Sequence, residues 1–184
     1  MLRNTAHSWG GIARLLHWLV AALMLAQVVL GWWAVTLRLS PLKLNLFVWH
    51  KSIGIVILVL ALARILWRVT NVTPGLPEGT PTWERHAARW NHALLYLVLI
   101  AMPVTGWIVN SASGIPFRIF WLVPLPAIVA PDKAVAEAAA AVHFWLFVLL
   151  CALLFVHVAA ALRHHFIKRN DVLARMLHGA GDRP

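Results

Sequence analysis

Four apolar stretches, each of about 20 residues, constrain this chain more than any other feature. They cover residues 15–36, 47–69, 91–113 and 142–166. A helix of about 20 apolar residues crosses the hydrocarbon core of a bilayer. Hydrophobic residues make up 61% of the 184 residues and charged residues only 12%, which excludes an ordinary soluble domain. The sequence therefore predicts an all-α integral membrane protein, with residues 1–184 forming one transmembrane four-helix bundle.

The basic residues predict an orientation. If the N-terminus lies inside, the inner segments hold eleven of the 16 Lys and Arg residues and the outer segments hold five. The inner ones are Arg3, Arg14, Arg64, Arg68, Arg85, Arg89, Arg163, Lys168, Arg169, Arg175 and Arg183, and the outer ones are Arg38, Lys43, Lys51, Arg118 and Lys133. This excess places both termini in the cytoplasm. The net charge of +10 is expected to interact with membrane lipid and not with nucleic acid.

Histidines interrupt the fourth apolar stretch, "VHFWLFVLLCALLFVHVAAALRHH" at 142–165. Imidazole is costly to bury in hydrocarbon unless it faces a partner. His143 and His157 are fourteen residues apart, close to four helical turns, so both rings leave the same helix face about 21 Å apart. One ring is therefore expected near each membrane surface.

Two further histidines match these depths. His17 lies two residues into the first stretch, which begins inside, and His50 lies near the start of the second, which begins outside. We call His17 with His157 the inner pair and His50 with His143 the outer pair. Two imidazole pairs at two depths are what two stacked b-type haems require, each iron held by nitrogen on both faces. No C-x-x-C-H motif is present, so we expect non-covalent haem.

Other interpretations of the histidines stay open at this point. A single histidine in a span is more often a core residue or a proton relay than a ligand. Zinc is the competing metal, but it prefers four tetrahedral ligands, and here there are two rings per level. A non-redox membrane protein, such as a proton-coupled transporter with a histidine relay, predicts a colourless preparation.

Small and basic residues near the histidines are candidates for further cofactor contacts. Three glycines would let a large planar ring approach the backbone, although ordinary helix packing explains each of them equally well. They are Gly31, Gly54 and Gly106. Three arginines near the inner surface could pair with haem propionates or anchor the helices there. They are Arg14, Arg64 and Arg68.

Several motifs resemble the bacterial cytochrome b561 family. They are "RLLHW" at 14–18, "WHKSIG" at 49–54, "AMPVTG" at 101–106, and His143 with His157 followed by "HHFIKRNDVLARML". The resemblance covers nearly the whole chain, and it implies a four-helix di-haem b protein of the bacterial inner membrane that exchanges electrons with ubiquinone. Transferred onto matching positions, the iron ligands are the inner pair and the outer pair, in agreement with the topological argument.

The resemblance also implies an activity. Short, stand-alone members, similar to this chain, are associated with oxidising superoxide at the periplasmic side and passing the electron to quinone. Longer relatives serve as membrane subunits of dehydrogenases. The preferred prediction is therefore a superoxide:ubiquinone oxidoreductase, and the alternative is a quinone-linked cytochrome b subunit that relays electrons to or from a periplasmic redox protein.

Three residues are candidates for the substrate ends. Two imidazoles on each iron leave no open position for oxygen, so substrates must meet the protein at its ends. Lys51 and Arg118 belong to the basic outer side, which would attract superoxide, or would simply bind headgroups. His164 at the inner end could donate a hydrogen bond and a proton to a quinone carbonyl, or it could lie among headgroups.

Overall fold

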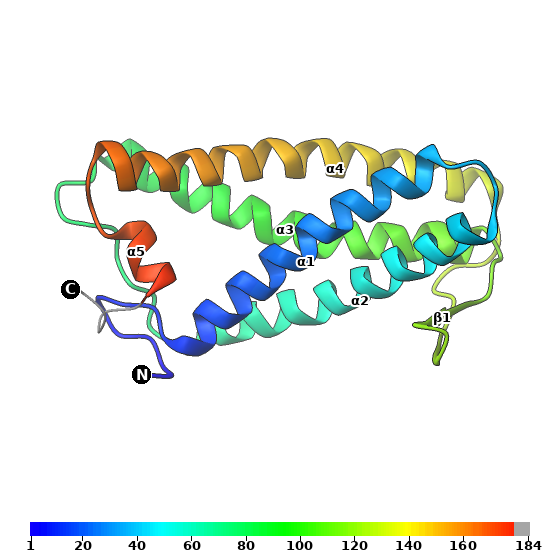
Figure 1. Cartoon of the computed structure of the whole chain (residues 1–184), viewed down its shortest axis with the longest axis horizontal. Coiled ribbons are helices and arrows are strands. Elements are labelled where there is room, and N and C mark those ends of the chain that lie inside the picture. The colour runs from blue at the N-terminus through cyan, green and yellow to red at the C-terminus, as the bar shows by residue number, and fades with distance from the viewer. Residues whose placement is uncertain (179–184) are drawn as a thin grey trace. The chain divides into compact units, whose positions relative to one another are not determined.

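The computed structural model describes residues 1–178, so Arg183, counted above, lies outside the described residues. The long helices are α1 (Gly11–Thr36), α2 (Pro41–Thr70), α3 (Thr82–Ala112) and α4 (Lys133–Leu162), followed by the π-helix η1 (Arg163–Ile167) and the short helix α5 (Val172–Leu177) (Figure 1). Four helices, with η1 continuing α4, are long and apolar enough to cross a membrane. The predicted mostly helical membrane fold is therefore confirmed.

Each long helix begins before the apolar stretch that predicted it, and in α2 and α4 a capping residue precedes the first turn. Ser40 precedes Pro41, and its Oγ accepts the N–H of Lys43 at 3.3 Å. Asp132 precedes α4, and its Oδ1 accepts the N–H of Val135 at 3.0 Å. Side-chain caps of this kind satisfy amides that the first helical turn leaves unpaired. The apolar stretch shows how much of a helix suits lipid, while the caps determine where it starts.

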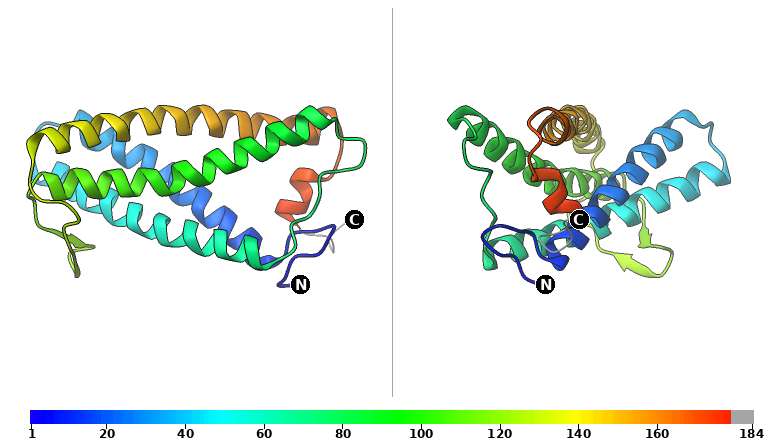
Figure 2. Two further views of the ribbon diagram at one scale, coloured as in Figure 1. Left: turned by 180° about the vertical axis from the view of Figure 1, so that it is seen from behind. Right: turned by 60° about the vertical axis from the view of Figure 1, so that its left-hand side comes forward.

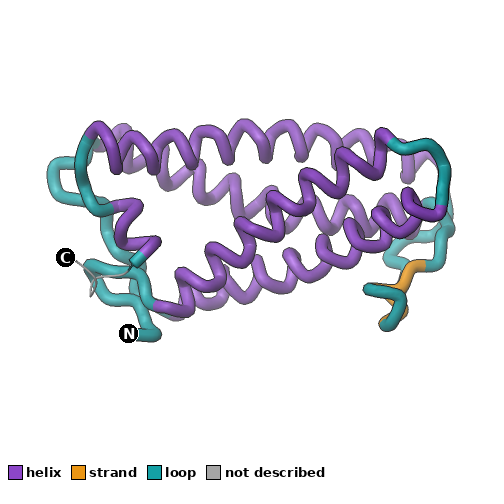
Figure 3. The backbone as a smooth tube through the Cα atoms, in the orientation of Figure 1, coloured by secondary structure: helices purple, strands orange, loops and turns teal. Residues whose placement is uncertain are grey.

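A β-hairpin in the connection between α3 and α4 was not predicted from the sequence. Strand β1 (Phe117–Ile119) pairs antiparallel with β2 (Val123–Leu125) (Figure 3, orange). The turn between the strands contains Phe120 and Trp121, whose φ angles of 47° and 64° are unusual for residues with a side chain. Pro124 lies in this short two-stranded sheet, where its missing N–H costs little.

Contacts to α2 fix the hairpin. The Oγ of Ser52, which has no exposed surface, accepts the backbone N–H of Phe120 at 2.8 Å. The ring of Trp49 packs against Phe120 and Trp121, with centroid distances of 5.4 and 5.9 Å. These contacts hold the strained turn beside the segment of α2 that carries His50.

Replacement of Ser52 by alanine is expected to loosen the hairpin without unfolding the helices. The N–H of Phe120 would lose its acceptor, at a cost of about 1–3 kcal/mol. Hydrogen exchange of the amides in residues 117–125 should become faster. The matched control is Ser113→Ala, since Ser113 is exposed just after the end of α3 and its hydroxyl donates only to the carbonyl of Val109, four residues earlier. Equal exchange in the two variants would contradict the anchoring role of Ser52.

The helices divide into two compact units. Unit 1 comprises 1–19, 62–97 and 150–184, and unit 2 comprises 20–61 and 98–149. In unit 2, Ala34, Ser52 and Ala61 have no exposed surface, which is typical of helices that pack closely through small side chains. Large apolar side chains such as Trp32 and Phe155 are 68% and 76% exposed, as expected for surfaces that face lipid.

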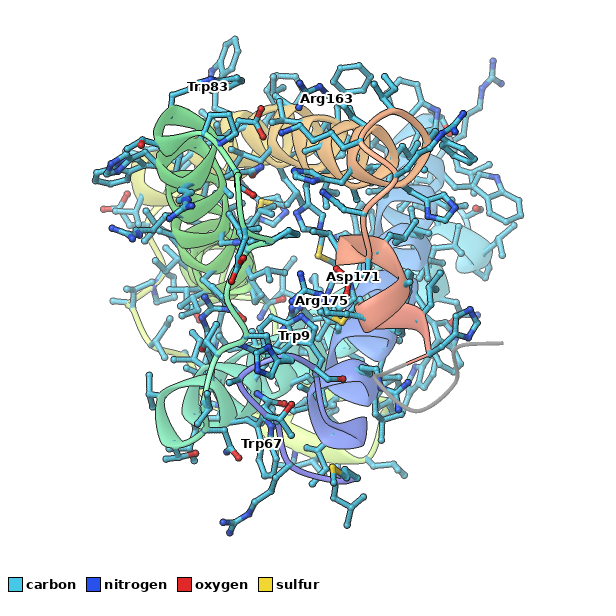
Figure 4. The ribbon with its side chains drawn as sticks, turned by 90° about the vertical axis from the view of Figure 1, so that its left-hand side faces the viewer. Trp9, Trp67, Trp83, Arg163, Asp171 and Arg175 are labelled. Carbon is cyan, nitrogen blue, oxygen red and sulfur yellow. The ribbon has the colours of Figure 1, made fainter. Side chains whose placement is uncertain are left out.

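In unit 1, the N-terminal segment runs beside α5 (Figure 2). Arg175 of α5 donates to the carbonyls of His7 and Gly75, at 3.3 and 3.1 Å. Trp18, the neighbour of His17, donates its Nε1–H to the carbonyl of Met176 at 3.0 Å. Figure 4 labels Arg175 at this position. Helix α5 is thereby tied to the part of α1 that carries His17.

Candidate functional site

The outer pair lies in unit 2. His50 of α2 and His143 of α4 face each other, with ring centroids 6.3 Å apart and ring planes at 71°. The inner pair lies in unit 1, where the rings of His17 and His157 are 6.2 Å apart with planes at 53°. The structure therefore brings together the same two pairs that topology predicted.

Both separations suit one metal between two opposite imidazoles. A metal–imidazole bond is about 2.0 Å long and the ring centre lies about 1 Å beyond the nitrogen, so the two centres should be about 6 Å apart. In addition, Nδ1 of His17 and Nδ1 of His50 are buried without a hydrogen-bond partner, so neither ring has the Nδ1 hydrogen bond expected of a buried structural histidine. Among the described residues, no group of three or more His, Cys, Asp and Glu side chains could hold a metal ion. The histidine pairs fit a b-type haem.

Two of the three glycines lie against imidazoles. A Cβ on Gly31 would be 2.9 Å from Cε1 of His50, and a Cβ on Gly106 would be 3.4 Å from Cε1 of His143. The protein groups that approach these two glycines closely are therefore the histidine rings. Each ring lies against a glycine of a neighbouring helix: His50 against Gly31 of α1, and His143 against Gly106 of α3.

Gly54 lies against a glutamine of α1. A Cβ on Gly54 would lie 3.3 Å from Nε2 of Gln27. This amide donates to the backbone carbonyl of His50 at 2.7 Å. Gly54 thus leaves room for a hydrogen bond between α1 and the turn of α2 that carries His50.

A third histidine joins the inner pair. The ring of His92, on α3, packs against His157 with a centroid distance of 5.4 Å. Its neighbour Asn91 donates to the carbonyl of Leu153 on α4 at 3.3 Å. We gave His92 no role from the sequence, although it lies near the start of an apolar stretch that begins inside, as His17 does. The depth argument used for His17 would have found it.

The three arginines near the inner pair have few anionic partners. The guanidinium groups of Arg64 and Arg68 lie 5.5 and 5.9 Å from the centre of the Tyr96 ring. Neither forms an ion pair with a carboxylate of the described residues. Arg14 donates to the carbonyl of Leu177 at 3.1 Å, while its Nε is buried without a partner. Within residues 1–178 none of the three is paired with a carboxylate, so all three are suited to bind haem propionates.

Lys51 and Arg118 both lie in unit 2 and both have protein partners. Nζ of Lys51 donates to Oδ1 of Asn110 at 2.7 Å and lies 5.5 Å from the centre of the Phe117 ring. Arg118 is exposed and donates to the carbonyl of Leu122 at 2.8 Å. The hairpin therefore positions both cations. Asn110, which orients Lys51, was not identified from the sequence.

His164 lies beside a partly buried ionic cluster that the sequence did not reveal. The carboxylate of Glu84, 9% exposed, pairs with Arg163 at 3.2 Å and with Lys168. Nε2 of His164 is 3.8 Å from the same carboxylate, which is too long for a hydrogen bond. Nδ1 of His164 lies 2.8 Å from Nδ2 and 3.2 Å from Oδ1 of Asn170, so the Asn170 amide holds the ring in place. Figure 4 labels Arg163 in this cluster.

Replacement of Glu84 by glutamine is expected to lower the melting temperature of the protein in detergent by several degrees. The amide would leave Arg163 and Lys168 facing each other without their shared anion. The matched control is Glu137→Gln, since Glu137 forms only an exposed pair with Lys133 at 3.8 Å and should barely change the melting temperature. If both variants melt with the wild type, the cluster does not stabilise this end of the bundle.

Four apolar helices that bury two facing pairs of imidazoles define a class of protein, the membrane-embedded b-type cytochromes. Within this class, the chain belongs to the prokaryotic cytochrome b561 family, whose model matches residues 8–179. The resemblance inferred from the sequence motifs is confirmed. Members of this family bind b-type haem and transfer electrons across membranes.

Three relatives show how far the similarity extends. The chain is 38% identical to "Cytochrome b561 homolog 2" of Escherichia coli (strain K12), over 95% of this chain and 93% of the relative. It is 30% identical to "Probable superoxide oxidase CybB" of Yersinia pestis, over 88% and 91%. It is 27% identical to "Cytochrome b561 homolog 1" of Escherichia coli (strain K12), over 88% and 92%. The similarity therefore covers nearly the full length of each protein.

Proposed function

We propose that this protein takes electrons from superoxide at the periplasmic face of the bacterial inner membrane and delivers them to ubiquinone. In this proposal both termini are cytoplasmic, and the outer and inner pairs each hold one haem b. The main support is that the protein has two separate imidazole pairs, and that within each pair the ring centres face each other at about 6 Å. When bound, a haem with two imidazole ligands supplies one-electron transfer and offers no open position to oxygen.

At the outer end, the chain's own residues would attract and guide the anion. Lys51 follows the ligand His50 directly, and Asn110 holds its ammonium group near that segment. Arg118 adds an exposed positive charge on the hairpin. Clustered cations raise the encounter rate of a small anion by roughly 10- to 1,000-fold at low salt. The name of the Yersinia pestis relative, probable superoxide oxidase, also supports superoxide as the donor.

At the inner end, His164 would serve ubiquinone. Its Nε2–H points toward Glu84 without a hydrogen bond, so it is available to a quinone carbonyl. In this proposal Nδ1 accepts from Nδ2 of Asn170, the shorter of its two contacts to that amide at 2.8 Å, and the ring proton is on Nε2. Overall, two superoxide anions would each lose one electron and leave as dioxygen, while one ubiquinone takes up two electrons and two protons. The proton on Nε2 of His164 would be one of these, replaced from the cytoplasm.

The test uses the full chain, purified and reconstituted in lipid nanodiscs with a short-chain ubiquinone. An enzymatic superoxide source should reduce the haem and then produce ubiquinol, and superoxide dismutase should abolish both. The rate should fall as salt is added, because steering by exposed cations is screened. The matched control is the same chain given the source's reductant without oxygen.

The alternative, a cytochrome subunit serving a periplasmic redox protein, predicts a different result. Superoxide would then fail to produce ubiquinol, while a co-purifying dehydrogenase would reduce the haem. A colourless preparation would contradict both proposals and favour the transporter interpretation.

A further inference from the structure

Thr105 of α3 lies against the imidazole of His143. Its Oγ1 is 3.0 Å from Nδ1 of the ring. The same hydroxyl donates its only proton to the carbonyl of Met102 at 2.9 Å, so toward the ring its oxygen can only accept. Nδ1 of His143 must therefore carry the ring proton, which leaves the lone pair on Nε2.

The motif "AMPVTG" places these groups within one turn of α3. The helix continues through Pro103, and Thr105 turns its hydroxyl back to the preceding turn. Gly106 follows and leaves room for Cε1 of His143, at 3.4 Å from where a Cβ would lie. The other imidazole of the outer pair has no such support, because Nδ1 of His50 is buried without a hydrogen-bond partner.

We propose that Thr105 is a positioning residue for the outer haem. By accepting the Nδ1 proton, Thr105 fixes the tautomer and orientation of His143 and makes its Nε2 a stronger electron donor. A more basic ligand stabilises ferric over ferrous iron, so Thr105 lowers the reduction potential of that haem. The inference rests on the proposed function, in which His50 and His143 hold a haem.

The test compares three variants of the full-length protein in detergent. Thr105→Val keeps the shape and removes the hydroxyl, Thr105→Ser keeps the hydroxyl, and Thr36→Val removes an equivalent helical bond, to the carbonyl of Trp33, away from any imidazole. Redox titration followed by visible spectra gives the midpoint potentials. The low-spin electron paramagnetic resonance spectrum reports the angle between the two imidazole planes.

In Thr105→Val we expect the midpoint potential of one haem to rise, namely the haem that His143→Ala removes. We also expect its resonance spectrum to change. Thr105→Ser and Thr36→Val should resemble the wild type. Loss of that haem from the valine variant, with retention in the serine variant, would support the same role.

Two results would overturn the inference alone. One is a valine variant with wild-type potentials, and the other is an equal shift in the valine and serine variants, which would assign the effect to packing. Haem is counted on the wild type first. A single haem per chain there would overturn the proposed function, and the role of Thr105 with it, so the two failures are distinguishable.

Discussion

Replacement of His143 by alanine is expected to leave the purified protein with one haem per chain in place of two. A methyl group cannot coordinate iron, and His50 alone would hold the outer haem weakly. Replacement of His157 should remove the other haem, since this ring faces His17. Haem content per chain, measured from the alkaline pyridine spectrum against protein concentration, checks both results.

The matched control for these ligand variants is His86→Ala. His86 lies exposed on α3 and belongs to neither pair, so its replacement should leave both haems bound. Retention of two haems in His143→Ala would show that the outer pair is not a haem site. Retention of two haems in His157→Ala would instead indicate that His92, which packs against His157, holds the inner haem.

Replacement of Gly31 by alanine is expected to remove most of the outer haem while the helices still fold. The new Cβ would lie 2.9 Å from Cε1 of His50, closer than carbon atoms pack. A free imidazole could rotate away at little cost, but one that holds iron cannot move without losing its bond. The predicted loss is therefore in haem content and not in helix content, which circular dichroism measures.

Two other glycines calibrate this prediction. Gly106→Ala places its Cβ 3.4 Å from Cε1 of His143, near an ordinary contact, so we expect the haem to stay bound with a small spectral change. Gly75→Ala meets nothing within 4 Å and should behave as the wild type. If Gly31→Ala binds as much haem as Gly75→Ala, the close packing of His50 on α1 does not limit haem binding.

The hairpin and the ionic cluster show where inference from the sequence stopped. The connection 110–141 gave only prolines between apolar residues, whereas the pairing of β1 with β2 depends on the anchor that Ser52 provides from α2. Glu84 and Lys168 are 84 residues apart, and no local pattern indicates that they form an ion pair. The hairpin and the ionic cluster therefore both depend on contacts between segments that are distant in the sequence.

The sequence by itself predicted the membrane spans, the family and the depths of the four paired histidines. These follow from length, hydropathy and helical period, which are properties of a single segment read along one dimension. Only the tertiary structure decided that Gly31 packs on His50, that Thr105 bonds His143 and that His92 joins the inner pair. The physical reason is that depth along a helix is encoded locally, while the neighbour that a side chain meets depends on how each helix is rotated against the next.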